Sequence, residues 1–142
     1  MRQERGKFAK TVHGSERNEP KTEVSKALYS QALSEYDAGS YDHAADLFHE
    51  LSKEHPLQPE IWQGLAACNQ EREDYPAALV AWSIAAILDE YNPLPHFHAA
   101  ECLFAHGEIA EAKKAIRMAL SLPCTEEFLD QMVHLKEVID HG

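Results

Sequence analysis

The sequence has 142 residues, enough for one domain of ordinary size and too few for two. Hydrophobic residues make up 44% and charged residues 26%, a balance that favours a packed fold over disorder. The formal charge is −11, and residues 1–24 hold 6 basic and 4 acidic residues, which leaves 7 basic and 20 acidic residues for the rest of the chain. Because so acidic a body repels phosphate backbones, nucleic-acid binding is not expected.

The cysteines and the apolar segments indicate a reducing, aqueous compartment. The longest apolar run, residues 77–88 with Ser83 inside it, has 12 residues, whereas a membrane span needs about 20. The N-terminus lacks an apolar stretch of signal-peptide length. The 3 cysteines have no CxxC spacing and do not form a disulfide framework. We therefore expect a cytoplasmic protein with no direct membrane insertion.

The chain divides into a polar arm, a repeating body and a last helix. Residues 1–24 lack hydrophobic periodicity, which predicts a flexible or partly helical arm that orders only in contact with a partner. Residues 25–126 form three rows of equal length without gaps, at 25–58, 59–92 and 93–126. Apolar residues at spacings of three, four and seven predict an amphipathic helix in 127–142, which we expect to cap the last row.

Each row is expected to fold as an antiparallel pair of helices. Two positions in every row hold alanine, where the helices of a pair must cross closely; these are Ala32, Ala66, Ala100, Ala44, Ala78 and Ala112. Gly39 and Gly107 mark the turn between the helices of the first and third rows. The pattern is typical of tetratricopeptide repeats. It predicts an all-α fold in which three helix-turn-helix repeats form a right-handed superhelix with a C-terminal capping helix.

The first helix of each pair is expected to line the concave side of the repeats. The side chains expected there form an aromatic and apolar wall at each end with a small polar floor between them: Tyr29, Leu33 and Tyr36, then Gln63, Ala67 and Gln70, then Phe97, Glu101 and Phe104. Such a groove suits an extended peptide, because each buried apolar anchor contributes about 1.5–3 kcal/mol. Two or three anchors suggest binding on the order of micromolar. The alternative is that these rings pack against the N-terminal arm or a neighbouring helix.

Val80, Ile84 and Ile87 form an apolar stripe on the convex side of the second row. The equivalent positions in the other rows are mostly polar: Asp46, Glu50 and Lys53, then Lys114, Met118 and Ser121. An apolar stripe confined to one row predicts a covered surface. We interpret it as a site for self-association or for a second client, with packing by the N-terminal arm as the alternative.

The sequence offers no catalytic or metal-binding pattern. None of the 9 histidines stands in an HExxH or CxxC arrangement with a second ligand, so no metal site is expected. There is no GxSxG motif, Gly-rich phosphate loop or Cys-His-Asn set. We therefore expect a binding protein without a cofactor and not an enzyme.

Four segments of the body resemble one known family. They are Leu28–Ala32 (LYSQA), Gly64–Gln70 (GLAACNQ), His98–Leu103 (HAAECL) and Gly107–Ala112 (GEIAEA). In these residues the chain is similar to the class II chaperones of bacterial type III secretion, small acidic tetratricopeptide proteins that hold the translocators. The resemblance covers about residues 25–122, and the HAAECL segment is far more specific than the repeat pattern alone.

The resemblance implies a function and partners. It implies a cytoplasmic chaperone that binds an extended segment of hydrophobic, pore-forming translocator proteins in its concave groove and keeps them soluble and competent for secretion. It also implies a homodimer. The alternative function is a general tetratricopeptide scaffold or co-regulator that joins folded partner proteins.

Overall fold

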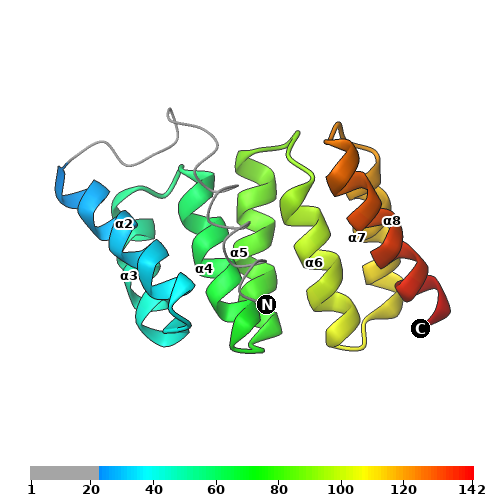
Figure 1. Cartoon of the computed structure of the whole chain (residues 1–142), viewed down its shortest axis with the longest axis horizontal. Coiled ribbons are helices and arrows are strands. Elements are labelled where there is room, and N and C mark those ends of the chain that lie inside the picture. Colours follow the sequence, from blue (N-terminus) through cyan, green and yellow to red (C-terminus); the bar gives the residue numbers. More distant parts are fainter. Residues whose placement is uncertain (1–22) are drawn as a thin grey trace.

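The structure is a computed structural model that describes residues 23–142, so the arm predicted at 1–24 lies almost entirely outside the described residues. Within this range the chain is helical and contains no strand (Figure 1). The helices are α2 (Glu23–Asp37), α3 (Tyr41–Glu54), α4 (Pro59–Glu71), α5 (Tyr75–Leu88), α6 (Leu94–Ala105), α7 (Ile109–Leu120) and α8 (Glu126–His141). None of these helices is long and apolar enough to cross a membrane.

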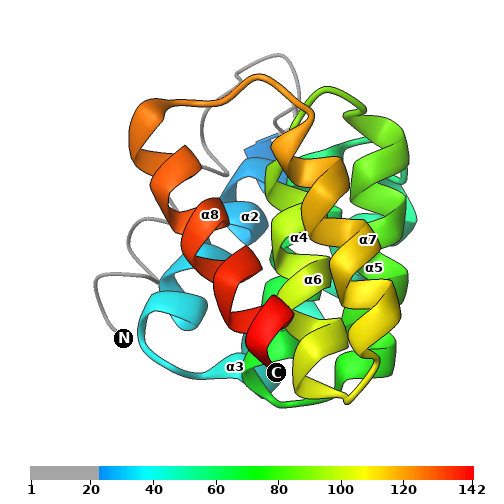
Figure 2. The same cartoon turned by 90° about the vertical axis from the view of Figure 1, so that its right-hand side faces the viewer.

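The helices stack in chain order as three hairpins followed by one more helix. Each helix packs on the next one along the chain, and α8 packs mainly on α7. Turned by 90°, the molecule has α5 and α7 on one side and α2 and α8 on the other (Figure 2). The predicted all-α fold of three tetratricopeptide hairpins with a C-terminal helix is confirmed.

Alanine is needed where the two helices of a hairpin cross. All six alanines at the two small positions of the rows have no exposed surface. A larger side chain at these positions would push the helices apart and open the core. The repeat therefore predicts the packing, because the same close approach recurs in every row.

The turn inside each hairpin uses the same backbone conformation three times. Gly39, Glu73 and Gly107 stand at the same position of the three rows, and all have positive φ, at 84°, 61° and 86°. At each turn the amide of the third residue after the helix donates to the carbonyl five residues before it, for example Asp74 N to Asn69 O at 2.9 Å. This is the Schellman arrangement, in which glycine is favoured because a β-carbon strains a left-handed residue.

Glu73→Gly is therefore expected to stabilise the protein. The substitution removes the strain of a left-handed glutamate, and the added freedom of the unfolded chain offsets part of the gain, which leaves about 0.5 kcal/mol. The free energy of unfolding is measured by urea denaturation followed by far-ultraviolet circular dichroism. Gly107→Ala is the matched control, because no atom lies within 4 Å of the new methyl group and only the backbone conformation opposes it. A stabilising Gly107→Ala would contradict the argument.

Candidate functional site

A cleft of about 1010 Å³ opens on the side of the repeats formed by their first helices. Most of its lining comes from α4, α6 and α8, and α2 and α5 contribute one residue each, Tyr36 and Trp82. Asn92 and Pro93, just before α6, and residues 123–125, in the loop between α7 and α8, complete the lining. The cleft therefore lies toward the C-terminal half of the stack.

The structure divides the residues that were predicted to bind a client. The cleft is lined by five of them: Tyr36, Ala67, Gln70, Phe97 and Glu101. These residues come from α2, α4 and α6, so the first helices of all three hairpins do converge on one space.

The other four predicted residues do not line the cleft. Tyr29, Leu33 and Gln63 are buried, and Tyr29 packs edge-to-face against Phe48 with ring centroids 6.2 Å apart. Phe104 is half-buried, and its ring lies against Gly142 at the end of α8. Their role in client binding stays a prediction.

One wall of the cleft comes from α8, for which the hydrophobic pattern predicts only a capping role. Its contribution includes an aromatic ring, an amide and two aliphatic side chains: Phe128, Gln131, Leu135 and Val138. The ring of Phe128 meets that of Phe97 at 5.1 Å with an interplanar angle of 67°, an edge-to-face contact that joins α8 to α6. The last helix therefore both covers the third hairpin and shapes the binding surface.

The repeat register itself could have identified the α8 residues. A fourth row would begin at residue 127, and α8 would then be its first helix. The second, fifth, ninth and twelfth positions of that row are the four α8 residues named above. Leu94 and Phe97 of α6 stand at the second and fifth positions of the third row, and they also line the cleft. The same register, carried one helix further, would have included the α8 residues among the predicted groove residues.

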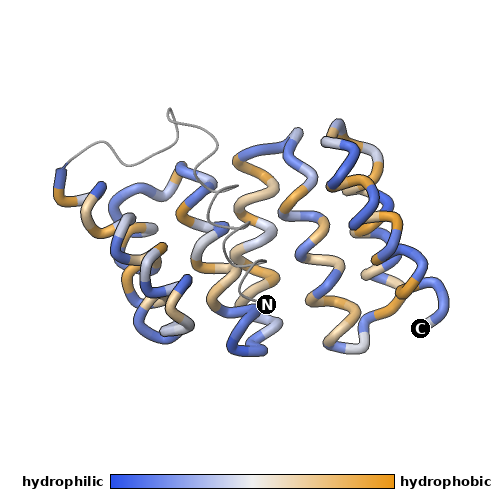
Figure 3. The backbone as a smooth tube through the Cα atoms, in the orientation of Figure 1, coloured by the Kyte–Doolittle hydropathy of each residue, from blue (hydrophilic) through white to orange (hydrophobic). Residues whose placement is uncertain are grey.

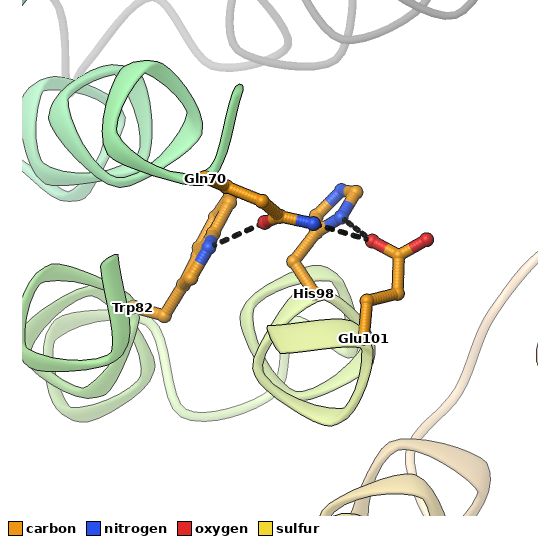
Figure 4. A network of polar contacts seen from close by, with 4 residues as sticks. All are labelled: Gln70, Trp82, His98 and Glu101. Carbon is orange, nitrogen blue, oxygen red and sulfur yellow. Dashed lines mark hydrogen bonds and ion pairs between the residues drawn. The ribbon is translucent and has the colours of Figure 1, made fainter. Parts of the chain in front are cut away.

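A polar network crosses the floor of the cleft from α5 to α6 (Figure 4). The indole nitrogen of Trp82 donates to Gln70 Oε1 at 2.9 Å, and Gln70 Nε2 donates to Glu101 Oε1 at 3.0 Å. The same carboxylate oxygen lies 2.6 Å from His98 Nδ1. The His98 ring stacks on Trp82, with centroids 4.7 Å apart and planes 21° apart. Three helices are thereby connected through side chains that point toward one another.

The network keeps the Glu101 carboxylate charged. Burial by itself raises the pKa of Glu101, but the charge of His98 and the hydrogen bonds from His98 and Gln70 outweigh it, so the pKa lies below its ordinary value. The second carboxylate oxygen points away from both partners (Figure 4). The cleft therefore holds a carboxylate with one oxygen fixed by the protein and another directed elsewhere.

The two buried cysteines, Cys68 and Cys102, are suited to a structural role. Burial raises the pKa of the Cys68 and Cys102 thiols to about 12, so both stay protonated at neutral pH. No group of three or more histidine, cysteine, aspartate or glutamate side chains within 23–142 is placed to hold a metal ion. The cleft therefore presents a shaped surface with three carboxylates, those of Glu71, Glu101 and Glu127.

Known proteins are similar to this chain in sequence and in architecture. No family model matches the chain. The low calcium response locus protein H of Yersinia pestis is 36% identical over 105 residues, which span 74% of this chain and 62% of that protein, just under two thirds of its length. PcrH from Pseudomonas aeruginosa matches with a TM-score of 0.78 and 27% identity, over 85% of this chain and 96% of that chain.

A second solved structure shows the family. It is the Yersinia enterocolitica type III secretion chaperone SycD in complex with a peptide of the translocator YopD. Its TM-score is 0.79 at 31% identity, and the match covers 84% of this chain and 94% of that chain. Because identity and fold agree over nearly all of that chain, this chain belongs to the family of type III secretion translocator chaperones.

Proposed function

We propose that this protein is a bacterial cytoplasmic chaperone that binds an extended hydrophobic segment of a type III secretion translocator in the cleft. The bound segment is kept soluble and competent for secretion. The observation that carries the proposal is the cleft itself, which is open in the described part of the chain. It is lined by the first helices of the three hairpins, α2, α4 and α6, and by α8, which follows them. The protein acts by binding and not by catalysis.

The two walls of the cleft suit apolar side chains of a client. Leu94 and Phe97 of α6 lie on one side, and Leu135 and Val138 of α8 lie on the other. Side chains of an extended peptide point alternately to opposite sides, so neighbouring residues of a client can reach both walls. Each apolar side chain that leaves water contributes about 1.5–3 kcal/mol.

The charged acceptor on the floor suits the backbone of the same client. An extended peptide presents unpaired N–H groups, which need acceptors once water is excluded. Glu101 offers a carboxylate oxygen that points away from His98 and Gln70. Backbone hydrogen bonds do not depend on the client sequence, so this floor would accept any translocator segment whose apolar residues fit the walls.

Val138→Asp is expected to abolish chaperone activity without unfolding the protein. Val138 is 40% exposed and lines the cleft, so a carboxylate there is tolerated in the free protein but must lose water when a client binds. We expect at least tenfold weaker binding of a translocator segment, measured by fluorescence anisotropy. On co-expression, a translocator that the wild type keeps soluble should move to the insoluble fraction.

Val133→Asp is the matched control for this experiment. Val133 lies on the same helix and is 41% exposed, but it does not line the cleft. It should bind and solubilise the translocator as the wild type does. If Val138→Asp and Val133→Asp bound the translocator segment equally well, the client would bind outside the cleft. A wild type that binds only folded partners and solubilises no translocator would instead favour a general scaffold.

A further inference from the structure

The cleft combines apolar walls with negative charge. Of the described residues that line it, three are glutamates, Glu71, Glu101 and Glu127, and none is lysine or arginine. His98 and His134 also line the cleft, and the lining would stay negative with both of them protonated. An open apolar surface beside carboxylates suits an occupant whose apolar side chains lie between positive charges.

The chain carries such a segment ahead of α2, outside the described residues. Residues 5–12 (RGKFAKTV), the arm segment, have no acidic residue and hold three basic ones, Arg5, Lys7 and Lys10. Phe8 and Val12 stand among these charges. Residues 25–142 hold 7 basic and 20 acidic residues, so the arm segment and the body of the protein are opposite in charge and attract each other.

The arm segment is close enough along the chain to reach the cleft. Residues 13–22 separate it from Glu23, the first residue of α2, and ten residues span at most about 33 Å. Tyr36 lines the cleft thirteen residues further along α2, which is about 20 Å along the helix axis. The chain can therefore return beside α2 as far as the cleft, and residues 5–12 add a span of up to about 26 Å.

We propose that residues 5–12 occupy the cleft when no client is bound, with Phe8 and Val12 against the apolar walls and the three basic side chains toward the three glutamates. The inference rests on the proposed function, because it takes the cleft to be the client site. The arm segment and the client then compete for one surface. The apolar walls stay covered in the free chaperone, and only a client that binds more tightly than the arm segment displaces it.

Two other surfaces offer the arm segment less than the cleft does. The outer face of α5 is apolar, with Val80 63% exposed, Ile87 79% exposed and Ile84 half-buried between them. α5 contains no charged residue, however, and is apolar over most of its length (Figure 3). The outer face of α3 is acidic, with Asp46 and Glu50 exposed, but the large apolar side chains of α3 are buried or half-buried. Of these three surfaces, the cleft provides both apolar contacts and carboxylates.

Attachment to the same chain makes even a weak contact effective. A tether of this length gives an effective concentration on the order of 1 mM. An arm segment that binds the cleft with a dissociation constant of about 0.1 mM would therefore occupy it for about nine-tenths of the time. The apparent affinity for a client would then fall about tenfold, since a client binds only the open fraction.

The first test uses Cys124, an exposed thiol that lines the cleft. Cys68 and Cys102 are buried, so a thiol introduced in the arm segment has Cys124 as its accessible partner. In full-length Ala9→Cys we expect an intramolecular disulfide with Cys124 on mild oxidation with oxidised glutathione, identified by peptide mass spectrometry. Failure to form a disulfide between these two positions would overturn the proposal.

Reversal of charges on the arm segment separates docking from mere reach. Lys7→Glu with Lys10→Glu, added to Ala9→Cys, should slow disulfide formation at least tenfold, because the chain length is unchanged while the segment is repelled by the glutamates. Arg17→Glu with Lys21→Glu is the matched control, since it changes the charge by the same amount outside the arm segment. Its rate should equal that of Ala9→Cys alone. Equal rates in both reversed variants would overturn the proposal.

Reversal of one charge in the cleft tests the other side of the contact. Glu127→Lys should slow disulfide formation about threefold, since Glu127 lines the cleft. Glu126→Lys is the matched control, because Glu126 is also exposed in the first turn of α8 but does not line the cleft. An equal or larger effect at Glu126 would place the arm segment outside the cleft and overturn the proposal.

A client-binding measurement distinguishes this inference from the proposed function. The probe is a labelled segment of a translocator that the wild type keeps soluble on co-expression. Lys7→Glu with Lys10→Glu should bind it about tenfold more tightly than the wild type does, by fluorescence anisotropy, and Arg17→Glu with Lys21→Glu should bind it as the wild type does. An unchanged affinity in the first variant would overturn the competition. Disulfide formation as expected in a chain that binds no translocator segment would instead overturn the proposed function and leave the arm contact in place.

Discussion

Gly64→Ala is expected to destabilise the protein by about 1–2 kcal/mol, although alanine is the better helix former. A β-carbon at position 64 would lie 2.3 Å from Cε1 and 2.4 Å from Cζ of the Phe48 ring. Phe48 is fully buried between α3 and α4, so its ring cannot move away without disturbing the core. Overpacking of this kind costs about 1–3 kcal/mol, and the gain in helix propensity recovers at most about 1 kcal/mol.

The free energy of unfolding of this variant is measured by urea denaturation. Ser83→Ala is the control, because it adds an alanine at an exposed position inside α5 and should leave stability unchanged or slightly higher. In a double-mutant cycle, Phe48→Leu should cost less in the Gly64→Ala background than alone, since the smaller side chain makes room for the methyl group. A Gly64→Ala protein as stable as the wild type would show that α3 and α4 can separate freely.

The fold could be predicted because its main constraints repeat. Close helix crossings, left-handed turns and bulky contacts recur at the same positions of each row, so each row tests the interpretation of the others. Glu73 is instructive, since its side chain does not favour a left-handed turn, yet the flanking rows place glycine at the equivalent position. Gly64 is different: it occurs in one row only, and its contact with Phe48 became evident from the structure.

The candidate site could be predicted only in part. The register correctly placed Ala67, Gln70 and Glu101 on one surface, because their direction follows from helix geometry. Whether a side chain on that surface is open or buried depends on the neighbouring helices, and a single row does not contain this information. Tyr29 illustrates the difference, since it occupies a groove position yet packs on Phe48.

The polar network shows a second limit of the sequence. Trp82 stands at the position that Phe48 and Ile116 occupy in the other two rows, and like them it is buried. Its indole nitrogen in fact bonds to Gln70, and its ring supports His98. These contacts join residues on three different helices, and they depend on side-chain rotamers that no periodicity specifies.

Trp82→Ala is expected to have the largest effect on stability of any single substitution considered, a loss of about 3–5 kcal/mol. The side chain is 1% exposed, and its removal leaves a cavity between α4, α5 and α6. A domain of this size has a total stability of about 5–15 kcal/mol, so the variant should unfold at much lower urea concentration. The loss also removes the donor that orients Gln70 and the ring on which His98 stacks.

Trp82→Phe separates the contribution of packing from that of the hydrogen bond. Phenylalanine keeps most of the buried surface and a ring for His98, but it cannot donate to Gln70, so we expect a loss of about 1–2 kcal/mol. Gln70 would then be free to rotate, and Glu101 would lose one of its two fixed partners. Client binding should therefore weaken in Trp82→Phe even where the protein is fully folded, as judged by circular dichroism. Unchanged client affinity in a folded Trp82→Phe protein would mean that the network holds the helices together without shaping the cleft.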